Sequence, residues 1–401
     1  MDNNNEREVL LRVENLCQYF KLKGGHVTKA VDDVSFDIKK GEVFGLVGET
    51  GCGKTTTGRS IIKIYNITSG SVYFHGQRIC AGKKSYKDAI KAARADMKEH
   101  PENAEQDLAI IEKAKADIKA ADFDQKNCDK EYAAKLCAEL DEKYKQDCLD
   151  ASGDSEKLKE LKAKYKNDRR IAKKTRLVTK IQMIFQDPAA SLNPRMTVKE
   201  IISEGMVING IKDKKYIEDK VYEILETVGL VREHAGRYPH EFSGGQQQRI
   251  GIARSVVMRP DMIIADEPVS ALDVSIQAQV INLLNDLRDQ FGLTILFIAH
   301  DLSVVKYFSD RIGVMYFGKM VELASSDELF AHPLHPYTRS LLSAIPLPDP
   351  HSEKKRVRIT YNPIADHDYS VNKPTMREIL PGHFVLCNDD EEARYKAELG
   401  I

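Results

Sequence analysis

Nine consecutive residues near the start of the chain have the types and the spacing of a phosphate-binding loop. They are Gly48, Glu49, Thr50, Gly51, Cys52, Gly53, Lys54, Thr55 and Thr56. In the pattern G-x-x-x-x-G-K-[ST], glycines let the backbone turn so that successive N–H groups point at phosphate oxygens. We expect Lys54 to reach the β- and γ-phosphates of a nucleotide, Thr55 to ligate Mg²⁺ and Thr56 to contact the α-phosphate.

A second group with chemical potential is the acidic pair Asp266 and Glu267, which follows four apolar residues. In phosphate-loop enzymes the first acid of such a pair holds the Mg²⁺ shell, and the second orients or deprotonates the attacking water. Two acids could also merely end a strand, but the phosphate loop in the same chain favours the catalytic interpretation. His300 ends the next apolar run and is a candidate sensor of the γ-phosphate, although a lone histidine there is more often only structural.

A third candidate is the run Ser243, Gly244, Gly245 and Gln246, which precedes a helix expected to begin near Gln248. A serine before two glycines at a helix N-terminus can form a second anion-binding site. One protein needs two such sites only if the nucleotide is contacted twice, so the pattern indicates a dimer. A plain capped turn is the alternative.

An α/β fold with a parallel sheet would bring these residues together. The phosphate loop follows an apolar run at 43–47 and precedes a helical one at 57–64, and buried strand patterns at 262–265 and 294–299 precede the acidic pair and the histidine. Ligands of open parallel sheets bind at the carboxyl ends of the strands, so we expect the site at that edge. A last hairpin is expected at 312–323.

Composition narrows the class of protein. A chain of 401 residues with 60 Lys+Arg and 61 Asp+Glu is long enough for one large domain with additions, and its charge gives no overall attraction to nucleic acid. Seven cysteines without a C-x-x-C pair indicate reduced thiols in the cytosol rather than disulfides or a zinc site. No apolar run reaches the roughly 18 residues of a membrane span, so we expect a separate chain to supply any membrane part.

Residues 81–175 differ in composition from the rest of the chain. They contain 23 Lys+Arg and 21 Asp+Glu, with apolar residues at helical spacing. We expect two or three long amphipathic helices, broken at Pro101 and at 151–154, which fold as an antiparallel hairpin and form surface rather than core.

The motifs together resemble those of ATP-binding cassette (ABC) ATPases. The resemblance rests on the phosphate loop, Gln186 after a strand, the signature 242–246, the acidic pair, the segment 270–273 and His300, all in the order of the family. It implies a RecA-like phosphate-loop core with an antiparallel β subdomain and a helical subdomain, and ATP with Mg²⁺ as ligands. It also implies a head-to-tail dimer in which each ATP lies between the phosphate loop of one subunit and the Ser243 site of the other.

The resemblance further implies a role for each matching residue. Lys54 grips the phosphates, and Thr55, Gln186 and Asp266 surround the metal. Gln186 also senses the membrane partner, Glu267 polarises water, His300 contacts the γ-phosphate and Asp273 couples the two sites of the dimer.

The adenine is expected to stack on an aromatic side chain of the first strand pattern. Phe20 aligns with the stacking residue of the family, and the adjacent Tyr19 could serve instead. Either ring could also be simple strand packing.

A narrower resemblance is to the ATPases of oligopeptide and dipeptide importers, in particular to the second of their two ATPase subunits. It is carried by residues 186–196, 266–275 and, most specifically, by 332–346 near the C-terminus. It implies a sister or identical ATPase, two transmembrane permease subunits, and indirectly an extracytoplasmic peptide-binding protein. The expected place is the cytoplasmic face of the cell membrane, without a nucleic-acid partner.

Alternatives remain for both the function and the charged block. The chain could be a soluble cassette ATPase of DNA maintenance or translation, or an importer subunit for glutathione or metal chelates. The block could be a tolerated insertion, a docking arm or, least in keeping with its balanced charge, a nucleic-acid contact. We expect four parts: nucleotide-binding residues 1–80, a charged helical insertion at 81–175, the second nucleotide-binding part at 176–325, and a C-terminal extension at 326–401.

Overall fold

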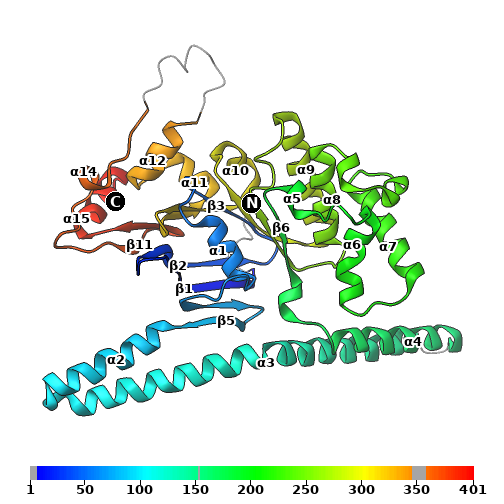
Figure 1. The fold of residues 1–401 in the computed structure, drawn as a ribbon, viewed down its shortest axis with the longest axis horizontal. Coiled ribbons are helices and arrows are strands. Elements are labelled where there is room, and N and C mark those ends of the chain that lie inside the picture. Colours follow the sequence, from blue (N-terminus) through cyan, green and yellow to red (C-terminus); the bar gives the residue numbers. More distant parts are fainter. Residues whose placement is uncertain (1–6, 152–153, 346–357) are drawn as a thin grey trace.

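The computed structural model describes residues 7–151, 154–345 and 358–401, and its fold is shown in Figure 1. Two β-sheets organise these residues. One has four strands in the order β2-β1-β4-β5 and the other has eight in the order β11-β12-β10-β9-β3-β8-β7-β6. The α/β class with an antiparallel β part and a helical part is therefore confirmed.

The smaller sheet is antiparallel throughout. Its strands are β1 (Val9–Lys21), β2 (Val27–Lys39), β4 (Ser69–Phe74) and β5 (Gln77–Lys83). One face packs on the larger sheet through a shared apolar core that includes Leu11, Phe74 and Leu46.

The larger sheet has a parallel centre. Its strands are β3 (Val43–Val47), β6 (Ile181–Ile184), β7 (Met262–Asp266), β8 (Thr294–Ala299), β9 (Arg311–Tyr316), β10 (Lys319–Ser325), β11 (Thr375–Leu380) and β12 (His383–Cys387). The five neighbours from β9 to β6 run parallel, and every residue of β3, β7 and β8 is buried. Continuous apolar runs are typical of strands covered on both faces, so the sequence pattern and the buried position agree.

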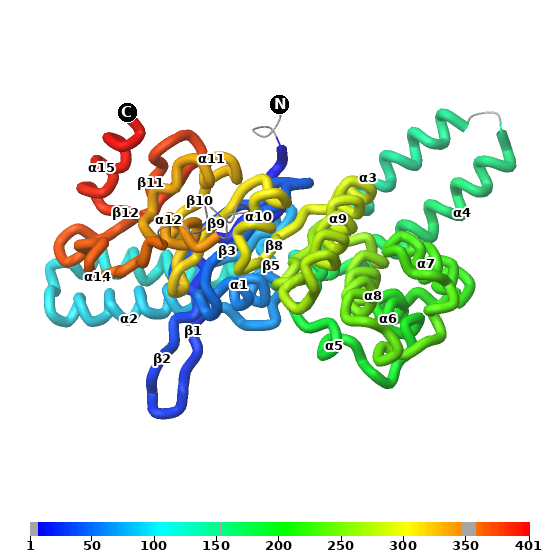
Figure 2. Tube along the Cα trace, turned by 90° about the horizontal axis from the view of Figure 1, so that it is seen from above, coloured from blue at the N-terminus to red at the C-terminus, as the bar shows by residue number. Residues whose placement is uncertain are grey.

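Helices lie on both faces of this sheet and form a separate group beyond β6. The helices are α1 (Lys54–Ile61), α5 (Pro188–Ser191), α6 (Val198–Ile208), α7 (Lys214–Thr227), α8 (Gly244–Val256), α9 (Val274–Phe291) and α10 (Leu302–Phe308). Figure 2 shows α6, α7 and α8 gathered to one side of the sheets, with α9 between them and the strands. This group is the expected helical part, and it carries the signature residues away from the phosphate loop.

The charged block forms three helices that extend below both sheets (Figure 1). They are α2 (Lys84–Glu99), α3 (Ala104–Asp150) and α4 (Ser155–Ala172), and we call them the arm. At 1.5 Å per residue α3 is about 70 Å long. The expected break at Pro101 is confirmed. The other lies at the end of α3, where Ser152 and Gly153 fall outside the described residues. The single hairpin that we expected is instead two, because α2 and α4 fold back on α3 from opposite ends.

The expectation that this block is surface only is wrong for the middle of α3. Cys128 and Tyr132 are buried in the same core as the antiparallel sheet. The Tyr132 hydroxyl donates to Asp261 at 3.4 Å, and the Leu177 N–H donates to Asp129 at 2.8 Å. Near its N-terminal end α3 also buries Ile111 and Ala114, where it packs with α2, but only its centre joins the core of the antiparallel sheet.

The C-terminal region continues the large sheet. Its helices are α11 (Ser326–Ala331), α12 (Pro336–Ser343), α14 (Pro363–Asp366) and α15 (Asp389–Leu399). The hairpin expected at 312–323 is present as β9 and β10, but it is not the last, because β12 pairs with β10 and β11 pairs with β12. Pro346, the end of the specific stretch 332–346, lies outside the described residues. Within the described residues, no helix is both long and apolar enough to cross a bilayer.

Candidate active site

The phosphate loop connects β3 to α1 and adopts a conformation that requires glycine. Gly48, Gly51 and Gly53 have φ values of 149°, 85° and 109°. A Cβ added to Gly48 would lie 2.2 Å from the carbonyl oxygen of Met315, and one added to Gly53 would lie 2.2 Å from that of Ala30. Gly53 also precedes the first turn of α1 without a side-chain cap. The first N–H groups of the helix are therefore left for a ligand, as an anion site requires.

Lys54 is folded back onto the loop. Its buried ammonium group donates to the carbonyl oxygens of Gly48 at 2.6 Å and Glu49 at 2.9 Å. The cation is thus held by the loop at a position that also lines the cleft.

Thr55 and Asp266 form a pair of oxygen donors at the end of β7. The Thr55 hydroxyl donates to Asp266 Oδ1 at 2.7 Å, and Asp266 is 0% exposed. Its Oδ2 has no hydrogen-bond partner within the described residues, with the Arg59 guanidinium 3.8 Å away. Burial raises the pKa of Asp266, and the Thr55 hydrogen bond and the Arg59 charge only partly oppose this effect. A hydroxyl beside a carboxylate with an unpaired buried oxygen fits Mg²⁺, which prefers oxygen ligands.

Glu267 brings together two residues from other strand ends. Gln186 Nε2 donates to Glu267 Oε2 at 2.9 Å, and His300 Nδ1 lies 3.3 Å from the same oxygen. Glu267 has a φ of 46°, an uncommon value for a residue with a side chain, and its N–H donates to Ile298 on β8. Such local strain is found where surrounding structure fixes a functional side chain in place. The Glu267 carboxylate, 11% exposed, faces the same cleft as the loop.

About half of the expected site residues line one open cleft of about 750 Å³. Its lining consists of Ala30, Thr50, Gly51, Gly53, Lys54, Thr55, Thr56, Gln186, Asp187, Glu267, Ser270, Ala271 and His300. Asp187, Ser270 and Ala271 lie within the segments 186–196 and 270–273 that carry the family resemblance, but no role was predicted for them. Ala30 lies on β2 and reaches the cleft only through the tertiary fold, so no local pattern could have identified it.

The signature residues lie elsewhere in the chain. Ser243 caps α8, where its hydroxyl accepts the N–H of Gln246 at 3.4 Å and Gln246 Oε1 accepts the Ser243 N–H at 3.1 Å. Ser243, Gly244, Gly245 and Gln246 are absent from the lining of the phosphate cleft, and Figure 2 shows α8 well apart from α1.

Asp273 is also absent from that lining and starts α9. Its turn packs near the signature, since a Cβ added to Gly245 would lie 2.7 Å from Ile276. One chain therefore presents two separate groups of expected ligand residues.

The two candidate adenine residues do not line the cleft either. The Phe20 ring packs edge-on against Tyr65, with ring centroids 5.3 Å apart. The Tyr19 hydroxyl donates to Asp32, and the Lys84 ammonium lies 5.1 Å from the Tyr19 ring. Tyr19 thus has polar partners of its own, and the stacking of adenine on Phe20 stays a prediction.

Cys52, like Gly48 and Glu49, belongs to the loop but does not line the cleft. Its thiol is buried, and burial raises its pKa against the opposing charge of Lys54. Because the thiolate is the nucleophile, we expect Cys52 to react slowly with alkylating agents.

Comparison with known proteins identifies the family. A family model described as "ABC transporter" matches residues 31–171 and 151–270. The oligopeptide transport ATP-binding protein OppF of Bacillus subtilis is 48% identical over 391 residues, which cover 97% of this chain and 99% of that protein. The chain belongs to the ABC transporter ATPase family.

Further matches give the branch of the family. A model described as "Oligopeptide/dipeptide transporter, C-terminal region" matches residues 321–371. The dipeptide transport ATP-binding protein DppF of Lactococcus lactis is 41% identical over 394 residues, covering 98% of each chain. The ABC ATPase is thus a member of the oligopeptide and dipeptide branch, and the resemblance inferred from the motifs is confirmed.

Solved structures agree on the fold of this ABC ATPase. The structure of cbiO1 from Clostridium perfringens, part of an ABC transporter complex, has a TM-score of 0.51 at 21% identity and covers 81% of this chain and 91% of its own. A dimeric ATP-binding cassette with ADP and Pi also has a TM-score of 0.51, at 20% identity, and covers 79% of this chain and 99% of its own. At 20–21% sequence identity, these similarities support the fold and no other property.

Proposed function

We propose that this ABC ATPase hydrolyses ATP to power the uptake of oligopeptides or dipeptides through a separate membrane permease. The observation that carries the proposal is the convergence of Lys54, Thr55, Asp266, Glu267 and His300 at the carboxyl edge of one sheet. The relatives named for peptide transport, together with the matched C-terminal region, support the cargo and disfavour a soluble ATPase of DNA maintenance or translation.

Each side chain has a task that its position permits. Lys54 and the N–H groups at the start of α1 bind the phosphates, and Thr55, Asp266 and Gln186 hold Mg²⁺, which when bound neutralises phosphate charge. Glu267 accepts a hydrogen bond from the attacking water and orients it toward the γ-phosphorus. His300, beside Glu267, contacts the γ-phosphate oxygens.

The active assembly contains two ATPase chains and a membrane part. Ser243 and its neighbours complete the cleft of a second chain, and Asp273 lies between the two sites, since neither group reaches the cleft of its own chain. The partner ATPase is a sister subunit or a second copy. Two permease subunits hold the pair at the cytoplasmic face of the membrane, and an extracytoplasmic peptide-binding protein delivers the cargo. We also propose that the chain is divided as expected from the sequence, into nucleotide-binding residues 1–80, the insertion at 81–175, the second nucleotide-binding part at 176–325 and the C-terminal extension at 326–401.

The proposal is tested with Glu267→Gln in proteoliposomes that contain the permease and the partner ATPase. We expect ATP turnover to fall by about 10² to 10⁴, the usual contribution of a positioned base, while MgATP affinity is retained. Glu233→Gln makes the same chemical change on an exposed helix end outside the cleft and should leave turnover and peptide uptake unchanged.

Two results would contradict the proposal. Turnover of Glu267→Gln at the unmodified rate would remove the catalytic assignment. ATP turnover by the unmodified assembly without accumulation of any di- or oligopeptide, at saturating binding protein, would remove the assigned cargo.

A further inference from the structure

A tyrosine of the C-terminal region contacts the phosphate loop. The N–H of Glu49 donates a hydrogen bond to the Tyr337 hydroxyl oxygen at 2.9 Å, although the two residues are 288 positions apart in the chain. Tyr337 lies in the first turn of α12 and is 2% exposed. The contact is partly buried, because the Tyr337 side is enclosed by the protein whereas Glu49 is an exposed residue.

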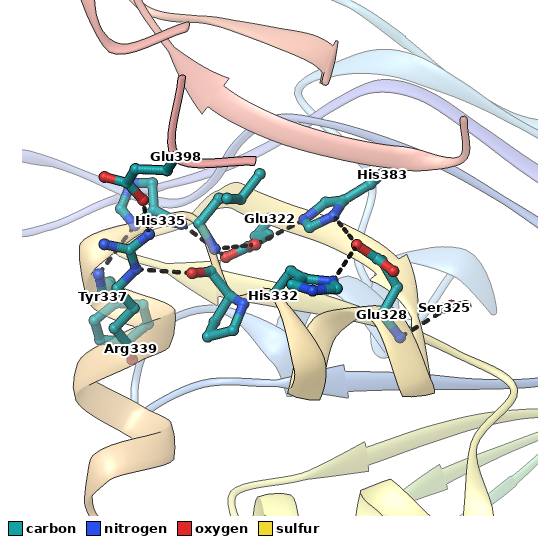
Figure 3. Close-up of polar contacts among 11 residues, drawn as sticks. Glu322, Ser325, Glu328, His332, His335, Tyr337, Arg339, His383 and Glu398 are labelled. Atoms are coloured by element: carbon teal, nitrogen blue, oxygen red, sulfur yellow. Dashed lines mark hydrogen bonds and ion pairs between the residues drawn. The ribbon is translucent and has the colours of Figure 1, made fainter. Parts of the chain in front are cut away.

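The backbone around Tyr337 is fixed by a network of polar contacts, which Figure 3 shows. The Glu322 carboxylate on β10, 0% exposed, accepts the N–H groups of Leu334 at 2.8 Å and His335 at 3.0 Å. His383 Nε2 lies 2.8 Å from the same carboxylate. The segment that leads into α12 is thus tied to β10 of the large sheet, between β12 and β9.

His335 completes the support of α12. Its Nδ1 accepts the N–H of Tyr337 at 3.1 Å, so the ring caps the helix on which the tyrosine sits. Burial lowers the pKa of His335 to about 3, so the ring stays neutral and keeps its acceptor near neutral pH.

The Tyr337 ring is held by two other tyrosines. Its centroid lies 4.4 Å from that of Tyr316, at the end of β9, and 5.5 Å from that of Tyr361. The turn after Tyr316 also touches the loop, because the Gly318 N–H donates to the Cys52 carbonyl oxygen at 2.8 Å. A backbone turn and a side chain therefore hold the loop at two different peptides.

We propose that Tyr337 is a positioning residue for ATP binding, which fixes the Glu49 peptide of the phosphate loop through its hydroxyl group. The carbonyl of that same residue accepts the Lys54 ammonium group, so the orientation of the Glu49 peptide sets where the lysine rests before it meets phosphate. This inference rests on the proposed ATP hydrolysis at the cleft. Tyr337 acts through Glu49 and Lys54, and it makes no contact with the reacting atoms.

The physical reason is preorganisation. A loop that is already held in one conformation loses less freedom when a ligand binds. Without the hydroxyl, the Glu49 N–H would be left without its partner in a partly buried position. We therefore expect the loss of the oxygen to weaken nucleotide binding and raise KM, while kcat changes much less.

The test is Tyr337→Phe in the full chain, which removes one oxygen and keeps the ring. The control is Tyr361→Phe, the same change in the same aromatic cluster, at a hydroxyl that makes no hydrogen bond to the described residues. MgATP affinity is measured by calorimetry with Glu267→Gln also present, so that hydrolysis does not interfere. Tyr337→Phe should weaken affinity by roughly 3- to 10-fold, the effect of losing one hydrogen bond, and the control should not.

A second measurement is hydrogen exchange, in which the unmodified protein alone can contradict the inference. In hydrogen exchange without nucleotide, the Glu49 amide should be protected, and Tyr337→Phe should remove that protection. Fast exchange of the Glu49 amide in the unmodified protein, or equal affinities of the Tyr337→Phe and Tyr361→Phe proteins, would overturn the inference. A failure of the unmodified protein to bind MgATP would instead count against the proposed function.

Discussion

At the scale of a single residue, Asp266 shows how the proposed Mg²⁺ site lowers the stability of the protein without the metal. The carboxylate is fully buried and one of its oxygens has no hydrogen-bond partner among the described residues. A charge in such a place is unfavourable unless a partner neutralises it. Burial raises the pKa of Asp266 for the same reason. The Arg59 guanidinium, 3.8 Å from the unpaired oxygen, offsets this cost only in part, which leaves the carboxylate able to bind a metal cation as well.

Asp266→Asn should consequently stabilise the nucleotide-free protein while it abolishes Mg²⁺-dependent turnover. We expect the Tm near pH 7 to rise by a few degrees, as roughly 1 kcal/mol does for a domain of this size. The folded-state pKa of Asp266 is raised, so its ionised form opposes folding above the unfolded pKa, near 3.8. The gain should grow as pH rises through the folded pKa and vanish below about pH 4.

The measurement is thermal unfolding of both proteins across this pH range with EDTA present. Asp88→Asn, a change of the same kind at an exposed residue of α2 outside the cleft, is the control for a general charge effect. A lower Tm for Asp266→Asn at neutral pH would show that the carboxylate has a structural partner instead.

The residues of the site differ in how far a sequence could predict them. Gln186, Glu267 and His300 could be named because each follows a strand pattern and matches a family motif, and the structure joins them at one carboxylate. Tyr337 could be assigned only to a family-specific stretch. Its contact with the phosphate loop depends on the packing of α12 beside β9, which no local pattern contains.

At the scale of elements, the arm is attached through the centre of α3. Tyr132 is 5% exposed and packs on His75, with ring centroids 5.4 Å apart, whereas Phe123 on the same helix is 62% exposed. The sequence indicated amphipathic helices correctly, because periodicity reports an apolar stripe. The sequence did not indicate that the centre of α3 is buried in the core, because the few buried positions are surrounded by many charged residues.

Tyr132→Ala should therefore destabilise the whole protein. We expect a loss of about 3–5 kcal/mol in the free energy of unfolding, the usual effect of truncating a buried aromatic side chain. Phe123→Ala is the matched control on α3 and should change stability by less than about 1 kcal/mol. Urea unfolding measures both, and equal effects of the two substitutions would mean that the arm is attached in another way.

At the scale of the whole molecule, Ser243 lies apart from the phosphate cleft of its own chain, and in the proposed pair it completes the cleft of the second chain. We expect Ser243→Arg to lower turnover in the assembled transporter by about 10²-fold, as the loss of a preorganised donor does. The MgATP affinity of the isolated chain should stay within about twofold, because the loop is untouched.

Ser155→Arg, the same substitution on the exposed start of α4, is the control. A large fall in the MgATP affinity of the isolated Ser243→Arg chain would place the signature in the cleft of its own chain and contradict the paired arrangement.

The pairing of β12 with β10 has a consequence for any attempt to shorten the protein. A chain that ended after α12 would expose the outer edge of β10, with free N–H and C=O groups, and would uncover the buried Glu322 carboxylate. Such an edge is a template for strands of other copies. The truncated ATPase would therefore tend to self-associate along the uncovered edge of β10. In the intact chain, β12 prevents this by pairing with β10.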